Sequence, residues 1–173
     1  SQGEGIGNTF LADIRNTDAL IHVLRCFDDP NLPHVEGSVD PVRDKETVDL
    51  ELAIKDLDSV EKKMQKLEKL AKIGEKEAKK GLEVLELYKN HLENFQPVRT
   101  AAVRDRDRQW IDDLFLLTAK PVMYVCNVDD SSAVGGNRYT EMLRKAVAGE
   151  ETEVLIIAAA LEADIAELEQ MED

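Results

Sequence analysis

The stretch VMYVCNVDD, residues 122–130, decides the fold class of this chain. It begins with a short run rich in β-branched and aromatic side chains and ends in polar residues, which is the pattern of a buried strand followed by a loop. A second such run, VLIIA at 154–158, comes after a Gly135-Gly136 turn and a helical spacing of apolar residues between 139 and 147. A strand, a helix and a second strand in this order predict a parallel sheet and an α/β fold.

The same pattern extends toward both ends of the chain. The apolar run from Ala19 to Phe27 predicts a further strand, and a helix over residues 9–15 is expected before it. Another helix is expected over residues 161–171, after the last strand. Because polar or turn residues bound all three apolar runs, we expect each of them to be a buried strand.

A long insertion of different composition separates the first two strands. Residues 44–95 are dense in Lys, Glu and Leu, and the apolar residues of the first half alternate spacings of three and four, as in the seam of a coiled coil. The seam residues are Leu50, Ala53, Leu57, Val60, Met64, Leu67 and Ala71. After Ile73-Gly74 the spacing resumes at Ala78, Leu85, Tyr88, Leu92 and Phe95. We therefore expect a helical hairpin, followed by one more helix over residues 104–117.

Composition and charge exclude several classes of protein. The chain has 173 residues with 22 Lys and Arg against 36 Asp and Glu, a formal net charge of −14, which repels nucleic acid and anionic lipid unless the basic residues are segregated. We therefore expect no direct DNA binding and no membrane binding. Two cysteines without a CxxC pair argue against a disulfide scaffold or a structural zinc site, and nothing at the start resembles a signal peptide. A cytoplasmic location is expected.

The polar residues that follow the strand at residues 122–126 are candidate ligand contacts. In an open parallel sheet, ligands bind beyond the carboxyl ends of the strands. Asn127 followed by Asp130 matches the way such sheets recognise a purine, with the amide at ring N7 and its neighbour and the carboxylate at the Watson–Crick edge. Asn and Asp are also common turn formers, so a purely structural role is the alternative.

No phosphate-binding loop is present in this sequence. Gly3, Gly5 and Gly7 are spaced like a glycine-rich loop, but no strand precedes them and no Lys-Ser or Lys-Thr follows. The pattern GxxxxGK[ST] occurs nowhere in the chain. This piece cannot by itself complete a nucleoside triphosphatase site.

Histidines and cysteines receive different interpretations according to their surroundings. His34 lies in a proline-flanked loop beyond a strand, where an imidazole could orient or activate a water, although a structural role is the alternative. His22 lies within a strand and His91 on the hairpin, so neither is expected to be catalytic. Cys26 and Cys126 fall at strand ends in apolar surroundings and are expected to be buried, unreactive thiols.

Taken in order, several motifs resemble one family, the YchF or Obg-like ATPases, a branch of the translation-factor P-loop proteins. The resemblance covers essentially the whole chain. The motifs are GEGIGN at 3–8, HV at 22–23 with RCF at 25–27, HVxGxVDPxRD at 34–44, LTxKP at 117–121 leading to NV at 127–128, and EADIAEL at 162–168.

The resemblance implies the C-terminal half of a P-loop NTPase parallel sheet with an inserted helical coiled-coil hairpin. The nucleotide-binding domain would comprise residues 1–43 and 119–173, and the insert residues 44–118. The implied function is a ribosome-associated switch that uses Mg²⁺ and hydrolyses ATP, often in preference to GTP. Alternatives are a GTP-specific GTPase and a non-enzymatic docking module acting through the hairpin. The chain would be a central fragment, inactive alone, without the P-loop and the C-terminal ubiquitin-like TGS domain.

The resemblance also assigns roles to individual residues. The family's Asn-x-x-Glu base motif falls on Asn127 and Val128 and reaches Asp130, and the family's loop histidine that acts on the attacking water matches His34. A small-residue loop that also contacts the base falls on Ala158, Ala159 and Ala160. Asp130 is one methylene shorter than the family's Glu and restores the Asn-x-x-Asp spacing of guanine readers, while Val128 stands where those readers keep a Lys. The choice between ATP and GTP therefore stays open, as does the oligomeric state.

Overall fold

The computed structural model describes residues 8–29 and 37–158. These residues divide into two compact units, which are described separately. The sheet unit holds residues 19–29, 37–47 and 122–158, and the hairpin unit holds residues 8–18 and 48–121. This division into compact units does not show which residues bind a nucleotide. The predicted boundaries of the helical insert, at residues 44 and 119, therefore stay predictions.

The sheet unit contains three parallel strands in the order β1 (Leu20–Arg25), β2 (Val122–Val128) and β3 (Val154–Ala158). Val23 lies opposite Val125 in the first pair, and Tyr124 lies opposite Val154 in the second. The predicted α/β fold with a parallel sheet is therefore confirmed.

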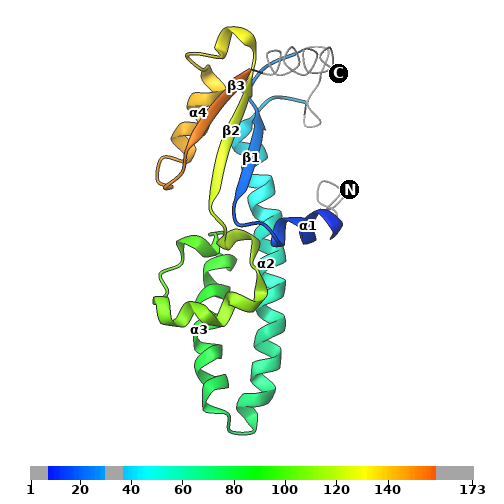
Figure 1. Ribbon diagram of the computed structural model, residues 1–173, viewed down its shortest axis with the longest axis vertical. Coiled ribbons are helices and arrows are strands. Elements are labelled where there is room, and N and C mark those ends of the chain that lie inside the picture. The colour runs from blue at the N-terminus through cyan, green and yellow to red at the C-terminus, as the bar shows by residue number, and fades with distance from the viewer. Residues whose placement is uncertain (1–7, 30–36, 159–173) are drawn as a thin grey trace, which may run out of the picture. The chain divides into compact units, whose positions relative to one another are not determined.

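One face of the sheet is covered and the other is partly open. Helix α4 (Arg138–Ala146) packs against the covered face (Figure 1), where Tyr139 and Leu143 join an apolar cluster. The strand residues of that cluster are Leu24, Cys26, Tyr124, Cys126 and Val128. On β1, however, Ile21 and Val23 are 61% and 60% exposed. The expectation of a buried strand is therefore wrong for β1, whose alternate residues face solvent. It is also wrong for β3, where Leu155 is exposed and Ala158 is the one buried residue.

The predicted helical hairpin is confirmed by two long helices. Helix α2 (Pro41–Lys72) and helix α3 (Lys76–Glu93) lie side by side (Figure 1), and Gly74, with φ of +94°, makes the turn between them. Such a conformation suits a residue without a Cβ atom. Helix α2 begins at a proline three residues before the expected start, because Pro is favoured in the first turn of a helix. A shorter helix, α1 (Asn8–Arg15), precedes β1 as expected.

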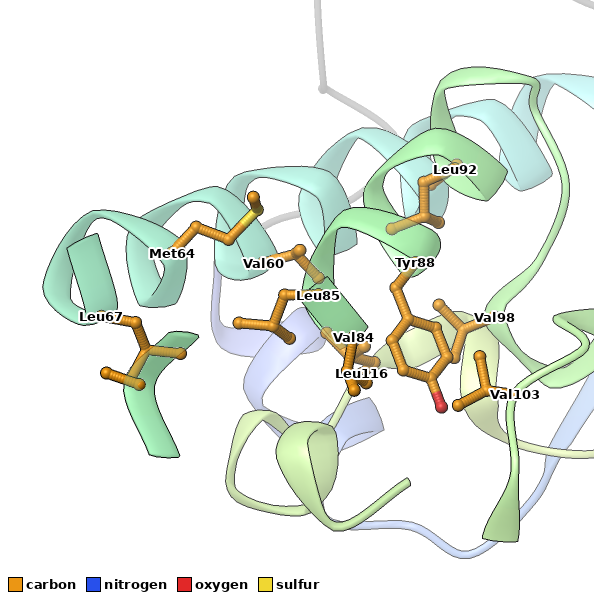
Figure 2. Packing of buried hydrophobic residues seen from close by; sticks show 12 residues of the cluster. Val60, Met64, Leu67, Val84, Leu85, Tyr88, Leu92, Val98, Val103 and Leu116 are labelled. Carbon is orange, nitrogen blue, oxygen red and sulfur yellow. The ribbon is translucent and has the colours of Figure 1, made fainter. Parts of the chain in front are cut away.

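The core of the hairpin unit lies between α2 and α3 (Figure 2). Its α2 residues include Val60, Met64 and Leu67, which confirms the central part of the predicted seam. Leu50 and Phe95, by contrast, are exposed, so both assignments are wrong. Helix α3 ends at Glu93 and Phe95 adopts a left-handed φ of 60°, which takes its side chain out of the helical pattern. The other core residues drawn in Figure 2 include Val84, Leu85, Tyr88, Leu92, Val98, Val103 and Leu116.

The segment after the hairpin forms short 3₁₀ helices instead of the single helix expected over 104–117. These helices are η1 (Val98–Thr100), η2 (Asp105–Leu114) and η3 (Leu117–Ala119). The ring of Trp110 packs so closely on α3 that a Cβ atom at Gly81 would lie 2.6 Å from its Cζ3 atom. A glycine inside a helix costs about 1 kcal/mol relative to alanine, and here it makes room for the indole.

A buried carboxylate ties α2 to the segment that precedes β2. Asp56 is fully buried, and its two oxygens accept hydrogen bonds from Leu117 N at 2.8 Å, Thr118 N at 2.7 Å and Thr118 Oγ1 at 2.6 Å. Burial raises the pKa of Asp56, and the bonds from Thr118 and Leu117 offset part of that effect. The carboxylate thereby satisfies two backbone N–H groups of η3 that have no water available.

Replacing Asp56 with Ala should therefore lower the free energy of unfolding by about 3 kcal/mol, because two buried N–H donors lose their acceptor. Urea unfolding followed by the helical circular dichroism signal measures the change. Asp58→Ala is the matched control, since Asp58 is exposed and pairs only with Lys62 on the helix surface at 2.8 Å. That variant should lose less than about 0.5 kcal/mol. Equal stabilities of the two variants would contradict the role assigned to Asp56.

Candidate functional site

The structure brings several of the predicted site residues to one edge of the sheet. Because the three strands are parallel, their carboxyl ends lie together, and the pairing sets Arg25 opposite Asn127 and Val128 opposite Ala158. The side chain of Ala158 is buried at the last position of β3. This is the edge of an open α/β sheet at which ligands bind.

Asn127 carries the most informative polar group at this edge. Its carbonyl oxygen accepts a hydrogen bond from Cys26 N at 2.7 Å, so its backbone is fixed by β1. Its side-chain Oδ1 is buried and has no hydrogen-bond donor among the described residues. An unsatisfied buried acceptor costs about 1–3 kcal/mol, so this oxygen is suited to a donor supplied from outside these residues.

The residues after Asn127 divide between structural and solvent-facing positions. The side chain of Val128 is fully buried in the apolar cluster of the sheet unit. Asp129 acts as a turn former: its Oδ2 accepts a bond from Ser131 Oγ at 2.7 Å, and the hydroxyls of Ser132 and Ser131 lower its pKa. Asp130 begins the short helix η4 (Asp130–Ser132) and is exposed. The structure therefore leaves the Asp130 carboxylate accessible to a ligand.

Some predicted residues lie outside the part of the chain that the structure describes. They are His34, Ala159, Ala160 and the helix expected over 161–171. Their assigned roles stay predictions. The burial expected of the two cysteines is confirmed, since both are free and buried, while their lack of reactivity stays a prediction. Cys126 beside it and burial raise the pKa of the Cys26 thiol.

The structure also places at this edge a residue that the sequence interpretation missed. The Oδ1 atom of Asn137 caps the start of α4 by accepting from Tyr139 N at 3.0 Å and Thr140 N at 3.1 Å. The Nδ2 atom of Asn137 donates to the carbonyl of Cys26 at 2.7 Å. The signal for the cap was present in the sequence, because Asn137 follows Gly135-Gly136 directly before a helical pattern.

A second missed contact joins the same two segments. The hydroxyl of Tyr139 donates to the carboxylate of Asp28, 2.7 Å from both oxygens. Arg138 Nη2 lies 3.4 Å from Asp28 Oδ2 and donates to the Tyr139 hydroxyl oxygen at 2.8 Å. No local pattern could have shown this, because Asp28 and Tyr139 are 111 residues apart in the sequence.

The described part of the chain offers neither a cluster of metal-ligating side chains nor a membrane-spanning helix. Residues 8–29 and 37–158 contain no group of three His, Cys, Asp or Glu side chains that could hold a metal ion. Within the same residues, no helix combines the length and the apolar character needed to cross a bilayer.

Comparison with known proteins shows close similarity to one group. The chain is 42% identical over 171 residues to the ribosome-binding ATPase YchF of Bacillus subtilis, covering 98% of this chain and 47% of that protein. It is 45% identical over 172 residues to the protein of the same name from Haemophilus ducreyi, covering 99% and 47%. The solved YchF GTPase of Schizosaccharomyces pombe matches with a TM-score of 0.81 at 36% identity, covering 94% of this chain and 45% of that one.

No protein-family model matches the chain. The chain spans about half the length of the curated relatives that it resembles. The parallel sheet, the helical hairpin inserted between β1 and β2, and the similarity of sequence along nearly the whole chain agree with one another. Over this shared length, the chain is similar in sequence and in fold to these YchF proteins.

Proposed function

We propose that the protein containing this chain binds and hydrolyses ATP and associates with ribosomes. The observation that carries the proposal is the arrangement at the carboxyl edge of the sheet, where the buried Oδ1 of Asn127 has no hydrogen-bond donor among the described residues and lies beside the end of β3. The relatives named ribosome-binding ATPase YchF support the same activity. A GTP-specific GTPase is the alternative, favoured by the name of the Schizosaccharomyces pombe protein.

The chemistry of Asn127 favours adenine over guanine. Next to its N7 acceptor, adenine carries an exocyclic N6 amine, whereas guanine carries a second acceptor, O6. An asparagine amide can accept from N6 with Oδ1 and donate to N7 with Nδ2 at the same time. A free Oδ1 acceptor at position 127 thus matches adenine and has no donor to meet at the same edge of guanine.

Asp130 is the residue that could reverse this preference. A carboxylate in the plane of the base would pair with guanine N1–H and its amine and repel the unprotonated N1 of adenine. We infer that Asp130 lies away from the base, because Val128 is buried where guanine readers keep a lysine. Asn127 and main-chain groups then read the base, and discrimination is mild.

Parallel calorimetric titrations of the full-length protein with ATP and GTP test this assignment. We expect GTP to bind no more than about tenfold tighter than ATP, a limit of about 1.4 kcal/mol. Asn127→Ala should weaken ATP binding by about 10- to 100-fold, since a bidentate amide contact contributes about 1–3 kcal/mol. Asp130→Ala is the discriminating control and should leave the ratio of the two affinities unchanged. A selective loss of GTP binding in Asp130→Ala would show that Asp130 faces the purine.

For hydrolysis, we propose that His34 orients or activates the attacking water. The support is the family resemblance and the place of His34 in the sequence, in a proline-flanked segment that follows the first predicted strand. The described residues contain no group of three His, Cys, Asp or Glu side chains that could hold a metal ion, so the Mg²⁺ expected from the resemblance is not assigned to them.

His34→Ala in the full-length protein should lower kcat for ATP hydrolysis by about 10²- to 10⁴-fold, the usual contribution of a general base, and leave ATP affinity nearly intact. His91→Ala is the control, because His91 lies on the hairpin and bonds Thr100 Oγ1 through Nε2 at 2.7 Å. A loss below threefold for His34→Ala would return this histidine to a structural role.

The hairpin supports ribosome association through its charge. Residues 62–80, here called the lysine-rich tip, carry eight lysines and three glutamates, so the tip is +5 while the rest of the chain is −19. Lys66, Lys69, Lys72, Lys76 and Lys79 are exposed and make no ion pair with a described residue. The basic residues are thus segregated in one part of the chain. This is the condition under which a chain of negative net charge can still bind nucleic acid. We infer that the tip binds ribosomal RNA phosphates, and such binding implies a cytoplasmic location.

Replacing Lys72 and Lys76 with Glu should weaken binding of the full-length protein to ribosomes by tenfold or more and flatten its salt dependence, because phosphate contacts release counterions. Co-sedimentation at several salt concentrations measures both effects, and ATPase activity without ribosomes should not change. In the matched control, the exposed Lys55 and Lys145, which lie outside the tip, are replaced with Glu. If both double variants bind ribosomes equally well, the tip is not the contact. If the proteins bind ribosomes and none of them hydrolyses a nucleotide, the alternative of a non-enzymatic docking module is favoured.

A further inference from the structure

Three consecutive residues at the start of α4, Asn137 to Tyr139, hold the chain where it leaves β1. The peptide of Cys26 is fixed on both sides, since its N–H donates to Asn127 O and its carbonyl accepts from Asn137 Nδ2, each at 2.7 Å. Through Cys26, the start of α4 is therefore connected to the strand end that carries the proposed base-reading amide.

The segment after β1 is also fixed two residues further along the chain, at Asp28. The Asp28 carboxylate accepts the Tyr139 hydroxyl at 2.7 Å, and Tyr139 is itself buried in the apolar cluster, with 7% of its surface exposed. The pair between Arg138 and Asp28 is solvent-exposed at 3.4 Å and contributes little by itself. The bond from Tyr139 is therefore the one that fixes Asp28.

The polar groups of this segment exceed what folding α4 requires. Serine or aspartate would cap the helix as well as Asn137 does, but neither has an N–H to give to Cys26. Phenylalanine would fill the space of Tyr139 in the core without reaching Asp28. Both side chains thus donate a hydrogen bond to the segment that follows β1. Asn137 donates to the Cys26 carbonyl, and Tyr139 donates to the Asp28 carboxylate.

We propose that Asn137 and Tyr139 are positioning residues for nucleotide hydrolysis, holding residues 26–29 in register with Asn127 at the carboxyl edge of the sheet. The inference rests on the proposed function. Ligands in parallel sheets contact the segments that follow the strands, and a misplacement of about 1 Å can cost about 10²-fold in rate. Neither Asn137 nor Tyr139 makes the bond from Cys26 N to Asn127 O, which holds the base-reading amide in place. The two residues therefore affect the rate of the reaction and not the affinity for the base.

The test uses Asn137→Asp and Tyr139→Phe in the full-length protein. Asn137→Asp keeps the helix cap and loses the donor to Cys26, and Tyr139→Phe keeps the ring and loses the donor to Asp28. Each should lower kcat for ATP hydrolysis by about 10- to 100-fold, while the ATP dissociation constant stays within about threefold and the melting temperature stays near that of the unmutated protein. A purely structural role would instead lower stability without separating kcat from affinity.

The matched control is Tyr124→Phe. Tyr124 is also buried in the sheet unit and donates to a carboxylate, Glu150 Oε2 at 3.2 Å, but it lies toward the amino end of β2. This variant should keep kcat. Asp28→Asn combined with Tyr139→Phe should cost less than the sum of the single changes, because the two residues share one bond.

A kcat within twofold of the unmutated protein in both Asn137→Asp and Tyr139→Phe would overturn the positioning role and leave the proposed function intact. A kcat that falls only together with the melting temperature would overturn it too. If Tyr139→Phe fails to fold, Asn137→Asp decides alone, with Asn137→Ser as a second variant that retains the cap. Absence of ATP and GTP hydrolysis by the unmutated protein would instead overturn the proposed function, and this inference with it.

Discussion

Parallel pairing of β2 with both of its neighbours is the constraint on which the rest of the structure depends. Parallel strands cannot be joined by a tight turn, so each connection must cross from the carboxyl end of one strand to the amino end of the next. The connection from β2 to β3 contains the short helices η4 and α4, whereas the one from β1 to β2 contains the entire hairpin. The same pairing gathers the three strand ends at one edge. Insertion and site therefore follow from one topological fact.

Much of the fold could be predicted because its signals are local. The strand at 154–158, the turn at Gly74 and the helix α4 follow from periodicity and turn residues alone. The exposed Phe95 shows the limit of that reasoning, because the helical spacing continues past the residue at which the backbone leaves the helix. Asp56 shows another limit. A charged residue on a lysine- and glutamate-rich helix is expected to face solvent, and its burial is explained by the two N–H groups of η3 that it accepts from.

The candidate site, like the fold, could be predicted only in part. Asn127 and Ala158 lie at the carboxyl ends of recognisable strands, so their meeting at one edge could be deduced from the parallel order. The contacts among Asp28, Asn137 and Tyr139 could not, because they join segments about 110 residues apart whose side chains meet only after the strands pair. Sequence patterns thus identify the groups proposed to face a ligand, and the structure adds the side chains that contact the segments carrying them.

Net charge misleads for a chain of this kind, because both proposed partners, a nucleoside triphosphate and ribosomal RNA, are polyanions. A charge of −14 describes the field at long range, but at physiological salt the Debye length is about 8 Å, so a ligand senses mainly the charges close to it. The lysine-rich tip is +5 over 19 residues and attracts phosphate locally, while the acidic remainder repels it. Such a distribution both permits binding and restricts it, since only approaches that bring the tip to the RNA are favourable. In the proposed complex with RNA, the acidic excess contributes orientation and the segregated lysines contribute affinity.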